Sequence, residues 1–268
     1  MSVSDTMPDI VAHVKTAGQL ALEEQETIDF SDRAYKPDES VVTEADRRVE
    51  NLLIERIADL HPAANLVTEE TEHSFDPEKP LTFAIDPIDG TDVFSQGMPG
   101  WCISVGILDN LLVPLAGVIF APRLDLLIVA DGERAATLNG SPLPAPRPAQ
   151  PISVRSNLMV TSRIHKRLDL SGYAGKIRGI GSAALHLCYH LIYLPVIGAL
   201  EGPGVHIWDI AAAHAINLAQ GQDLWYLNGN PLDYRALIDG GPGADVVIAG
   251  QEPTVQALRS TLKRLPAD

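Results

Sequence analysis

Residues 81–91 read Leu-Thr-Phe-Ala-Ile-Asp-Pro-Ile-Asp-Gly-Thr. The apolar run at 81–85 predicts a short buried strand, and two carboxylates, Asp86 and Asp89, follow directly after it. A proline stiffens the turn between them, and the glycine after them permits a backbone conformation that other residues resist. Carboxylates, a hydroxyl and the open N–H groups of a following helical turn suit a hard cation that bridges to a phosphate. An ordinary acidic turn is the alternative interpretation, because Asp, Pro and Gly are common turn residues.

Two further acidic positions have the same character. Glu69 follows a short apolar strand expected at 65–68, and Asp209 begins a helix that is rich in small residues. An Asp at a helix start is most often a cap, and a Glu pair is most often a solvated surface pair. Each of these acids nevertheless lies at the boundary of an apolar element, which is where a metal ligand has to be.

The N-terminal half of the chain predicts two helices followed by a sheet. The helices are expected from Pro8 to about Glu24 and from 44 to 60, with Thr43 as the N-cap of the second. Further apolar runs predict strands at 101–108, 111–120, 124–130 and 135–138, and a hairpin turn is expected at 109–110. Such a meander is typical of an antiparallel sheet, here with both helices packed on one side.

A proline-rich stretch separates the two halves. Five of the residues from 142 to 151 are proline, and such a stretch continues neither a helix nor a central strand. We therefore expect one domain at 1–148 and a second at 149–268. Beyond the boundary, strands and helices alternate, which indicates an α/β layer. Strands are expected at 158–160, 177–180, 196–200, 224–227 and 246–249, and helices at 182–193, 209–218 and 253–262.

The composition of the chain argues against nucleic acids and anionic membranes as binding partners. The chain has 268 residues, 46% of them hydrophobic, and a formal net charge of −15, so its surface repels nucleic-acid backbones and anionic lipids. The N-terminus shows no leader pattern, and no apolar stretch is long enough to span a bilayer, so a cytoplasmic location is expected. Cys102 and Cys188 lie in apolar runs and are interpreted as buried thiols.

Four motifs in order resemble the inositol monophosphatase family of Mg²⁺-dependent phosphomonoesterases. This family shares a superfamily with fructose-1,6-bisphosphatase and the 3′-nucleotidases. The motifs are Val42-Thr43-Glu44-Ala45-Asp46, Glu69-Glu70, Asp86-Pro87-Ile88-Asp89-Gly90-Thr91 and Trp208-Asp209-Ile210-Ala211-Ala212. The resemblance implies an α/β fold, a layered αβαβα sandwich like that of inositol monophosphatase and fructose-1,6-bisphosphatase, with the active site in the cleft between the halves.

The resemblance also implies residue roles. Two to three Mg²⁺ ions would be held by four carboxylates and one backbone carbonyl, which belong to Glu69, Asp86, Asp89, Asp209 and Ile88. Asp46 and Thr91 would position and deprotonate the attacking water, and Glu69 counts with them as catalytic.

On the substrate side, the resemblance assigns phosphate-binding N–H groups to Gly90 and Thr91. The turn Gly181-Ser182-Ala183 and the carboxylate of Asp209 would contact substrate, and Lys36 would belong to a segment that closes over the site. Glu201 is the nearest counterpart of an acidic residue that contacts an inositol hydroxyl, but it lies one residue further from Trp208 than the family spacing.

The expected function is hydrolysis of a small phosphate monoester by metal-activated water, with an inositol monophosphate as leading substrate. The alternatives are 3′(2′),5′-bisphosphate nucleotides, fructose-1,6-bisphosphate and histidinol phosphate, or, in a different class, an inactive relative that binds phosphorylated ligands. A homodimer and lithium sensitivity are further implications of the resemblance.

Histidine pairs suggest a zinc site as a minor alternative. His186 and His190 lie four residues apart on an expected helix, while His206 and His214 flank Asp209. Lone histidine pairs on apolar helices are more often packed or hydrogen-bonded, so zinc is disfavoured.

Overall fold

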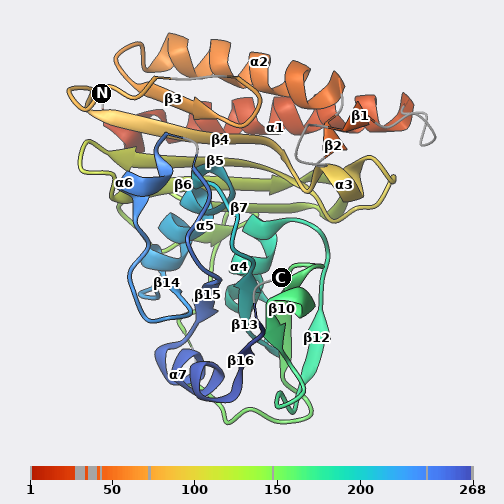
Figure 1. Cartoon of the computed structure of the whole chain (residues 1–268). Coiled ribbons are helices and arrows are strands. Elements are labelled where there is room, and N and C mark those ends of the chain that lie inside the picture. Colours follow the sequence, from red (N-terminus) through yellow and green to blue (C-terminus); the bar gives the residue numbers. More distant parts are fainter. Residues whose placement is uncertain are drawn as a thin grey trace.

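Figure 1 shows the chain as a computed structural model that describes residues 2–27, 34–35, 41–42, 44–71, 74–146, 148–239 and 241–266. Thr43, the expected N-cap, and Lys36 lie outside the described residues. Two sheets form the frame, and in Figure 1 the strands of the first run across the view while those of the second run along it from top to bottom. A two-stranded pair, β1 (Ala34–Tyr35) with β2 (Val41–Val42), is antiparallel and separate from both sheets.

The first sheet has seven strands in the order β3-β4-β5-β6-β7-β8-β9. Their bounds are β3 (Asn65–Thr68), β4 (Leu81–Asp89), β5 (Cys102–Asp109), β6 (Pro114–Ala121), β7 (Leu126–Ala130), β8 (Thr137–Leu138) and β9 (Ser141–Pro142). The antiparallel meander predicted from residue 81 onward is confirmed for β4 to β8, and β9 extends it by a strand that was not predicted. β3 is different, because it pairs with β4 in parallel, so that the carboxyl ends of these two strands meet at one edge.

The β5–β6 connection is longer than the predicted two-residue hairpin. Residues 110–113 form the turn rather than the start of a strand, with Leu112 at a φ of 64°. Asp109 stabilises this turn, because its Oδ1 accepts hydrogen bonds from the N–H groups of Leu111 and Val113, both at 2.8 Å. The expected strand at 124–130 likewise begins only at Leu126, after a 3₁₀ turn at Pro122–Leu124.

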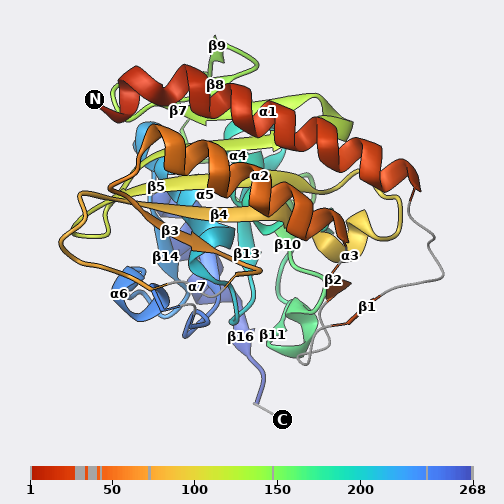
Figure 2. The same cartoon turned by 90° about the horizontal axis from the view of Figure 1, so that it is seen from above.

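Helices α1 (Val3–Thr27) and α2 (Glu44–Leu60) cover one face of this sheet, as predicted. Figure 2 shows them lying next to each other across the strands. α1 begins earlier than the expected Pro8 because Ser2 and Asp5 form a reciprocal cap, with Asp5 N–H donating to Ser2 Oγ at 3.2 Å and Ser2 N–H to Asp5 Oδ2 at 2.9 Å. The apolar stripes of both helices pack on the sheet in one buried cluster that includes Ile10, Val49 and Phe83.

The second sheet has five strands in the order β12-β10-β13-β15-β14. Their bounds are β10 (Asn157–Val160), β12 (Lys176–Arg178), β13 (Val196–Glu201), β14 (Leu224–Tyr226) and β15 (Val247–Gly250). β10 is parallel to both β12 and β13, whereas β15 is antiparallel to β13 and β14. Four short elements of this half were not expected from the sequence, namely a 3₁₀ turn (Ile164–Lys166), α6 (Tyr234–Leu237) and the pair β11 (Leu168–Asp169) with β16 (Lys263–Arg264).

Helices α4 (Ala183–Ile192) and α5 (Ile207–Ala219) lie between the two sheets, and α7 (Glu252–Thr261) covers the far face of the second. The order of layers is therefore helices, sheet, helices, sheet, helix, and the predicted αβαβα sandwich is confirmed. A buried cluster joins the layers across the middle and contains Ile119 of β6, Leu185 of α4, Ile210 of α5 and Ala199 of β13. No helix in the described part of the chain is both long enough and apolar enough to cross a bilayer.

Small residues bring α5 close to the first sheet. A Cβ atom on Gly106 of β5 would lie 2.5 Å from Ala211 Cβ, and one on Gly117 of β6 would lie 2.6 Å from the carbonyl oxygen of Ala212. The helix backbone can therefore approach strands that carry no side chain at these points. α5 also begins at Ile207, earlier than the expected Asp209, because His206 is the N-cap.

We predict that Gly106→Ala destabilises the protein by roughly 1–3 kcal/mol, because the added methyl group forces α5 away from the sheet. Urea unfolding monitored by circular dichroism measures this loss. Gly202→Ala is the matched control, since its Cβ would lie at an ordinary 3.4 Å from Thr161 Cγ2 and its cost should stay within about 0.5 kcal/mol. Equal stability of the two variants would contradict the close contact between α5 and β5.

Candidate metal centre and active site

Three predicted ligands converge at the end of β4. One carboxylate oxygen from each of Asp86, Asp89 and Asp209 lies within 4.8 Å of the others. Asp86 and Asp89 are buried, and Asp209 is partly buried. Oxygen atoms this close together can share a hard divalent cation, whereas three charged carboxylates without one repel each other.

An irregularity in β4 lets two acids of one strand face the same site. Residues three apart in a regular strand point to opposite faces. The pairing of β4 with β5 shifts register between Asp86 and Asp89, which is a β-bulge or similar irregularity. Ile88 lies inside this stretch with its side chain fully buried, and its N–H donates to Asp86 Oδ1 at 3.0 Å.

The N-terminus of α4 holds Asp89. The Ser182 hydroxyl donates to Asp89 Oδ2 at 2.6 Å, the Ala184 N–H to the same oxygen at 2.7 Å, and the Ala183 N–H to Oδ1 at 3.0 Å. Ser182 is also the N-cap of α4, because its Oγ accepts from the Leu185 N–H at 3.0 Å. The turn expected to contact substrate therefore orients Asp89 directly.

Asp209 reaches the cluster from the first turn of α5. It is the third residue after the N-cap His206, and its Oδ2 accepts from the His206 N–H at 2.5 Å. The Ser104 hydroxyl of β5 donates to the carbonyl oxygen of Trp208 at 3.3 Å and so ties this end of α5 to the first sheet.

Glu69 lies beside Asp86 because β3 and β4 are parallel. Thr68 pairs with Ile85, so the next residue on each strand extends from the same edge. The charge of Glu69 contributes to the raised pKa of Asp86, which places the two carboxylates near each other. Buried Glu50 of α2 supports this segment, because its carboxylate accepts from the Glu70 N–H at 2.8 Å and from the Thr71 hydroxyl. The sequence analysis missed Glu50, although it lies one helical turn after Asp46, on the same face.

Asp46 and Thr91 are in direct contact. The Thr91 hydroxyl lies 3.1 Å from Asp46 Oδ1 and 3.0 Å from the Ile88 carbonyl oxygen, and it can donate its proton to either. Asp46 is fully buried on α2, and Thr91 begins the short helix α3 (Thr91–Phe94). The structure thus joins the first and third sequence motifs through one hydroxyl.

Close packing of glycines joins this turn to the α4 turn. Gly90 has a φ of 98° and Gly181 a φ of 123°, both in the left-handed region that favours glycine. A Cβ atom on Gly181 would lie 2.4 Å from Val93 Cγ2. The Ser182 N–H donates to the Gly100 carbonyl oxygen at 3.0 Å. These contacts set the α3 turn, which carries Gly90 and Thr91, directly against the turn Gly181-Ser182-Ala183.

Burial and mutual repulsion change the acidity of the cluster. Burial raises the pKa of Asp86 well above its usual range, and the neighbouring charges of Glu69, Asp89, Asp209 and Asp46 raise it further. Burial also raises the pKa of Asp209 well above its usual range, with Asp89 adding to the effect and the His206 N–H opposing it. The pKa of Asp89 is raised by burial, and its hydrogen bonds from Ser182, Ala184 and Ala183 lower it in part.

Glu201 is buried and paired with a histidine. His186 Nδ1 lies 2.5 Å from Glu201 Oε1, and the exposed fractions of the two residues are 1% and 3%. His186 Nε2 accepts from the Ile180 N–H at 2.9 Å, so the ring proton is on Nδ1 and is donated to Glu201. The sequence analysis named Glu201 but missed this partner, which follows Ser182 by one helical turn.

The other histidines do not extend the cluster. Both ring nitrogens of His186 are engaged in hydrogen bonds, and the His206 ring stacks on Trp208 at 4.8 Å between centroids. Cys102 and Cys188 are buried free thiols, as expected, and Cys102 Sγ lies 3.3 Å from the Ser182 Oγ. Within the described residues, the metal-binding arrangement consists of aspartates rather than histidines.

Comparisons with known proteins find similarity along most of the chain. A model of the inositol monophosphatase family matches residues 6–253. Inositol monophosphatase 1 from tomato, Solanum lycopersicum, is 29% identical over 217 residues, which span 74% of this chain and 77% of that protein. A 3′(2′),5′-bisphosphate nucleotidase from Buchnera aphidicola is 26% identical over 227 residues, which span 82% of this chain and 84% of that protein.

Among solved structures, a staphylococcal inositol monophosphatase-1 has the same fold. Its TM-score is 0.79 over 95% of this chain and 94% of that chain, at 17% sequence identity. That structure is an inhibitory complex obtained by soaking in lithium chloride.

We predict that Asp86→Asn raises the melting temperature of the metal-free protein at pH 8 by at least about 2 °C. The pKa of Asp86 in the folded state lies above its value of about 3.9 in the unfolded state. Between these two pKa values the folded state binds a proton that the unfolded state has lost, so the stability of the protein falls as pH rises from the lower value to the higher one. Asn cannot ionise, so the advantage of the variant should shrink as pH falls toward 4. Thermal unfolding in excess chelator across this pH range measures the difference.

The control for this experiment is Asp9→Asn, which alters an exposed acid on α1. It should show no such pH-dependent gap. A gap for Asp86→Asn that is absent, or that widens as pH falls, would contradict the raised pKa.

Proposed function

The chain belongs to the inositol monophosphatase family of phosphomonoesterases, and on that premise we propose that it is a Mg²⁺-dependent enzyme that hydrolyses a small phosphorylated metabolite, with an inositol monophosphate as leading substrate. The observation that carries the proposal is the convergence of Asp86, Asp89 and Asp209 at the end of β4. Glu69 lies beside them, and Thr91 with Asp46 lies next to the same turn.

The donor set fits Mg²⁺. It consists of oxygen atoms alone, from the four carboxylates of Glu69, Asp86, Asp89 and Asp209 and the carbonyl of Ile88, and hard cations prefer such ligands. The mutual repulsion of the carboxylates provides the reason for two to three ions rather than one. When bound, these ions would offset the negative charge, lower the pKa of a water molecule and stabilise the leaving alkoxide.

Thr91 and Asp46 would orient the attacking water and take up its proton. In the structure, the Thr91 hydroxyl can donate to Asp46 Oδ1, which leaves the lone pairs of Thr91 Oγ1 available to a water molecule. A proton from that water could pass through the hydroxyl to the buried carboxylate. Removal of the hydroxyl should therefore lower kcat more than it raises KM.

The phosphate group would lie at the start of α3. The first N–H groups of a helix have no partner within the helix, and those of Gly90 and Thr91 begin this turn. Directly beside them, the turn Gly181-Ser182-Ala183 is fixed by Gly100 and Asp89. We assign the substrate to the surface that these two adjoining turns form together, with Asp209 at its edge.

Glu201 is our candidate for recognition of the leaving group. His186 occupies Glu201 Oε1, so the other oxygen, Oε2, is the one that could accept a hydrogen bond from a substrate hydroxyl. The carboxylate is near the cluster, because its charge contributes to the raised pKa values of Asp89 and Asp209. A polyol such as inositol supplies a suitable donor. Lys36, whose role would be to close over the site, lies outside the described residues.

Three further properties concern the oligomeric state of the protein, its location in the cell and its inhibition. On the strength of the family resemblance, we propose a homodimer in the cytoplasm that is inhibited by lithium. The lithium-inhibited complex of the staphylococcal protein supports the last of these three properties. An inactive phosphate-binding relative is disfavoured, because this chain has an acid at each metal-ligand position together with Asp46 and Thr91.

We predict that Asp89→Asn lowers Mg²⁺-dependent phosphate release by at least ~100-fold while the far-ultraviolet circular dichroism spectrum stays unchanged. The substitution removes a charge from the cluster and sets an amide N–H against the N–H groups of α4. Asp9→Asn serves as the control and should retain full activity. Turnover in Asp89→Asn close to that of the unchanged enzyme would refute the assignment of the metal site.

A substrate panel tests the leaving group. We expect release of phosphate from inositol-1-phosphate with the highest kcat/KM, ahead of 3′-phosphoadenosine 5′-phosphate, fructose-1,6-bisphosphate and histidinol phosphate, and none in excess chelator. Glu201→Gln should raise KM for inositol-1-phosphate severalfold but leave that for p-nitrophenyl phosphate unchanged, because the latter has no hydroxyl to donate.

The panel separates the alternatives. A higher kcat/KM for 3′-phosphoadenosine 5′-phosphate would support the assignment as a phosphomonoesterase but would contradict inositol monophosphate as the leading substrate. No release from any compound by the folded protein would favour the inactive relative.

A further inference from the structure

The ring of His186 lies where two segments of the active site meet. β13 ends at Glu201, and α4 begins after the turn Gly181-Ser182-Ala183. Nδ1 of His186 lies 2.5 Å from Glu201 Oε1, and Nε2 lies 2.9 Å from the backbone nitrogen of Ile180, which directly precedes that turn. One side chain therefore connects the leaving-group side of the site with the turn that holds the metal ligand Asp89.

The two hydrogen bonds of the ring run in opposite senses. The backbone N–H of Ile180 can only donate, so Nε2 of His186 has to present a lone pair to it. The ring proton is consequently on Nδ1, where it is donated to the carboxylate of Glu201. A neutral imidazole has one donor and one acceptor on opposite edges, so this side chain satisfies both partners at once.

Glu201 depends on this ring for its orientation. Among the described residues, His186 is the one hydrogen-bond partner of the Glu201 side chain, and no Lys or Arg pairs with it. Its second oxygen, Oε2, is unpaired but is not among the fully buried unpaired atoms of the described residues, so it reaches solvent. A carboxylate that is 3% exposed and has only a neutral partner costs free energy that an apolar residue would avoid. This cost favours a functional role for the open oxygen.

The other hydrogen bond fixes the backbone that leads into the Asp89 turn. The turn donates to Asp89 from the Ser182 hydroxyl and the Ala183 N–H. On its other side, the carbonyl oxygen of Ile180 packs against Gly100, where an added Cβ atom would lie only 1.8 Å from that oxygen. His186 and Gly100 thus hold the backbone of Ile180 from two sides, and a displacement of Ile180 would move the donors to Asp89.

We propose that His186 is a positioning residue of the phosphatase site with two separable roles. Through Nδ1 it orients Glu201 so that Oε2 can accept from a hydroxyl of the leaving group. Through Nε2 it holds Ile180 and, with it, the turn that orients Asp89. This inference rests on the proposed function, because it assigns both roles to the same active site.

The position of the ring proton can be measured without any substrate. Long-range ¹H–¹⁵N NMR spectra of the full chain distinguish a protonated ring nitrogen from an unprotonated one, and His186→Gln identifies the signals by their loss. We expect the proton on Nδ1, and we expect its resonance to shift in Glu201→Gln because the acceptor changes from a carboxylate to an amide. A proton on Nε2, or a ring unaffected by Glu201→Gln, would overturn the proposal.

Two amide substitutions separate the roles. The amide group of Gln extends about as far as Nε2 of a histidine, so His186→Gln can still accept from Ile180 but loses the donor to Glu201. It should raise KM for inositol-1-phosphate about 3- to 10-fold, the value of one hydrogen bond, and leave KM for p-nitrophenyl phosphate unchanged. Adding His186→Gln to Glu201→Gln should raise KM no further, because His186 acts on the leaving group through Glu201.

The second substitution tests the turn. The amide of Asn lies near the position of Nδ1, so His186→Asn can still donate to Glu201 but no longer accepts from Ile180. Isothermal titration calorimetry should show the Kd for Mg²⁺ raised by at least about threefold, while the preference for inositol-1-phosphate over p-nitrophenyl phosphate is retained. An unchanged Kd for Mg²⁺ in this variant would refute the second role.

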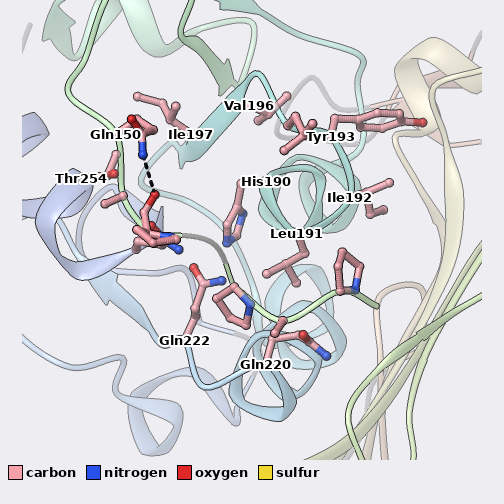
Figure 3. A pocket seen from close by; sticks show the side chains of 17 residues that line it. Gln150, His190, Leu191, Ile192, Tyr193, Val196, Ile197, Gln220, Gln222 and Thr254 are labelled. Carbon is pink, nitrogen blue, oxygen red and sulfur yellow. Dashed lines mark hydrogen bonds between the residues drawn. The ribbon is translucent and has the colours of Figure 1, made fainter. Parts of the chain in front are cut away.

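His190→Gln is the matched control, because His190 lies one turn further along the same helix. Figure 3 shows its ring beside Gln222, at a cavity near the C-terminal end of α4 that no residue assigned to the active site lines. This variant should leave KM and the Kd for Mg²⁺ unchanged. Equal effects of His186→Gln and His190→Gln would mean that both histidines act only through the stability of α4, and would overturn the proposal.

Failure of the inference and failure of the proposed function give different results. If Glu201→Gln raises KM for inositol-1-phosphate and His186→Gln does not, the role of His186 is wrong while the phosphatase assignment stands. If the unchanged protein neither binds Mg²⁺ nor releases phosphate from any compound of the panel, the proposed function is refuted and the roles of His186 with it.

Discussion

Repulsion among buried carboxylates is the constraint on which the rest of this structure depends. Asp86, Asp89 and Asp209 come within 4.8 Å of one another, and burial raises the pKa of all three. Such a cluster opposes folding unless the surrounding chain or a bound cation offsets it. The chain provides part of the compensation through hydrogen-bond donors. Asp89 accepts from the Ser182 hydroxyl and from two N–H groups of α4, whereas Asp86 and Asp209 accept from one N–H group each.

The fold supports this cluster by bringing helix N-termini against one sheet edge. α4 and α5 both begin there, so their dipoles favour negative charge at the same place. α5 can approach because Gly106 and Gly117 have no side chain between the sheet and the helix. The close packing that stabilises the middle of the molecule therefore also determines where Asp209 lies.

The two ends of α4 differ in the state of their polar groups. At the N-terminal end, Ser182, Ala183 and Ala184 donate to Asp89, and His186 has partners at both ring nitrogens. At the C-terminal end, burial lowers the pKa of His190 to about 4, and the side chains of Gln222 and Asn217 oppose this shift in part. These two histidines are four residues apart on one helix, and the sequence offers no sign that their surroundings differ. Satisfied polar groups at the N-terminal end of the helix favour a preorganised site.

Local pattern alone determined that helices lie near 44–60 and 182–193, that the strands β4 to β7 exist, and the order of the acidic motifs, because periodicity and turn residues act over a few positions. It did not determine the bounds of the strands, since β4 continues through Asp89 and β6 begins only at Pro114. It did not determine the start of α5, since the cap at His206 needs the folded turn before it. Tertiary structure alone decided that β3 is parallel to β4, which sets Glu69 beside Asp86, and that Glu201 pairs with His186. These arrangements join segments far apart in the chain, so they follow from which surfaces bury together rather than from any local preference.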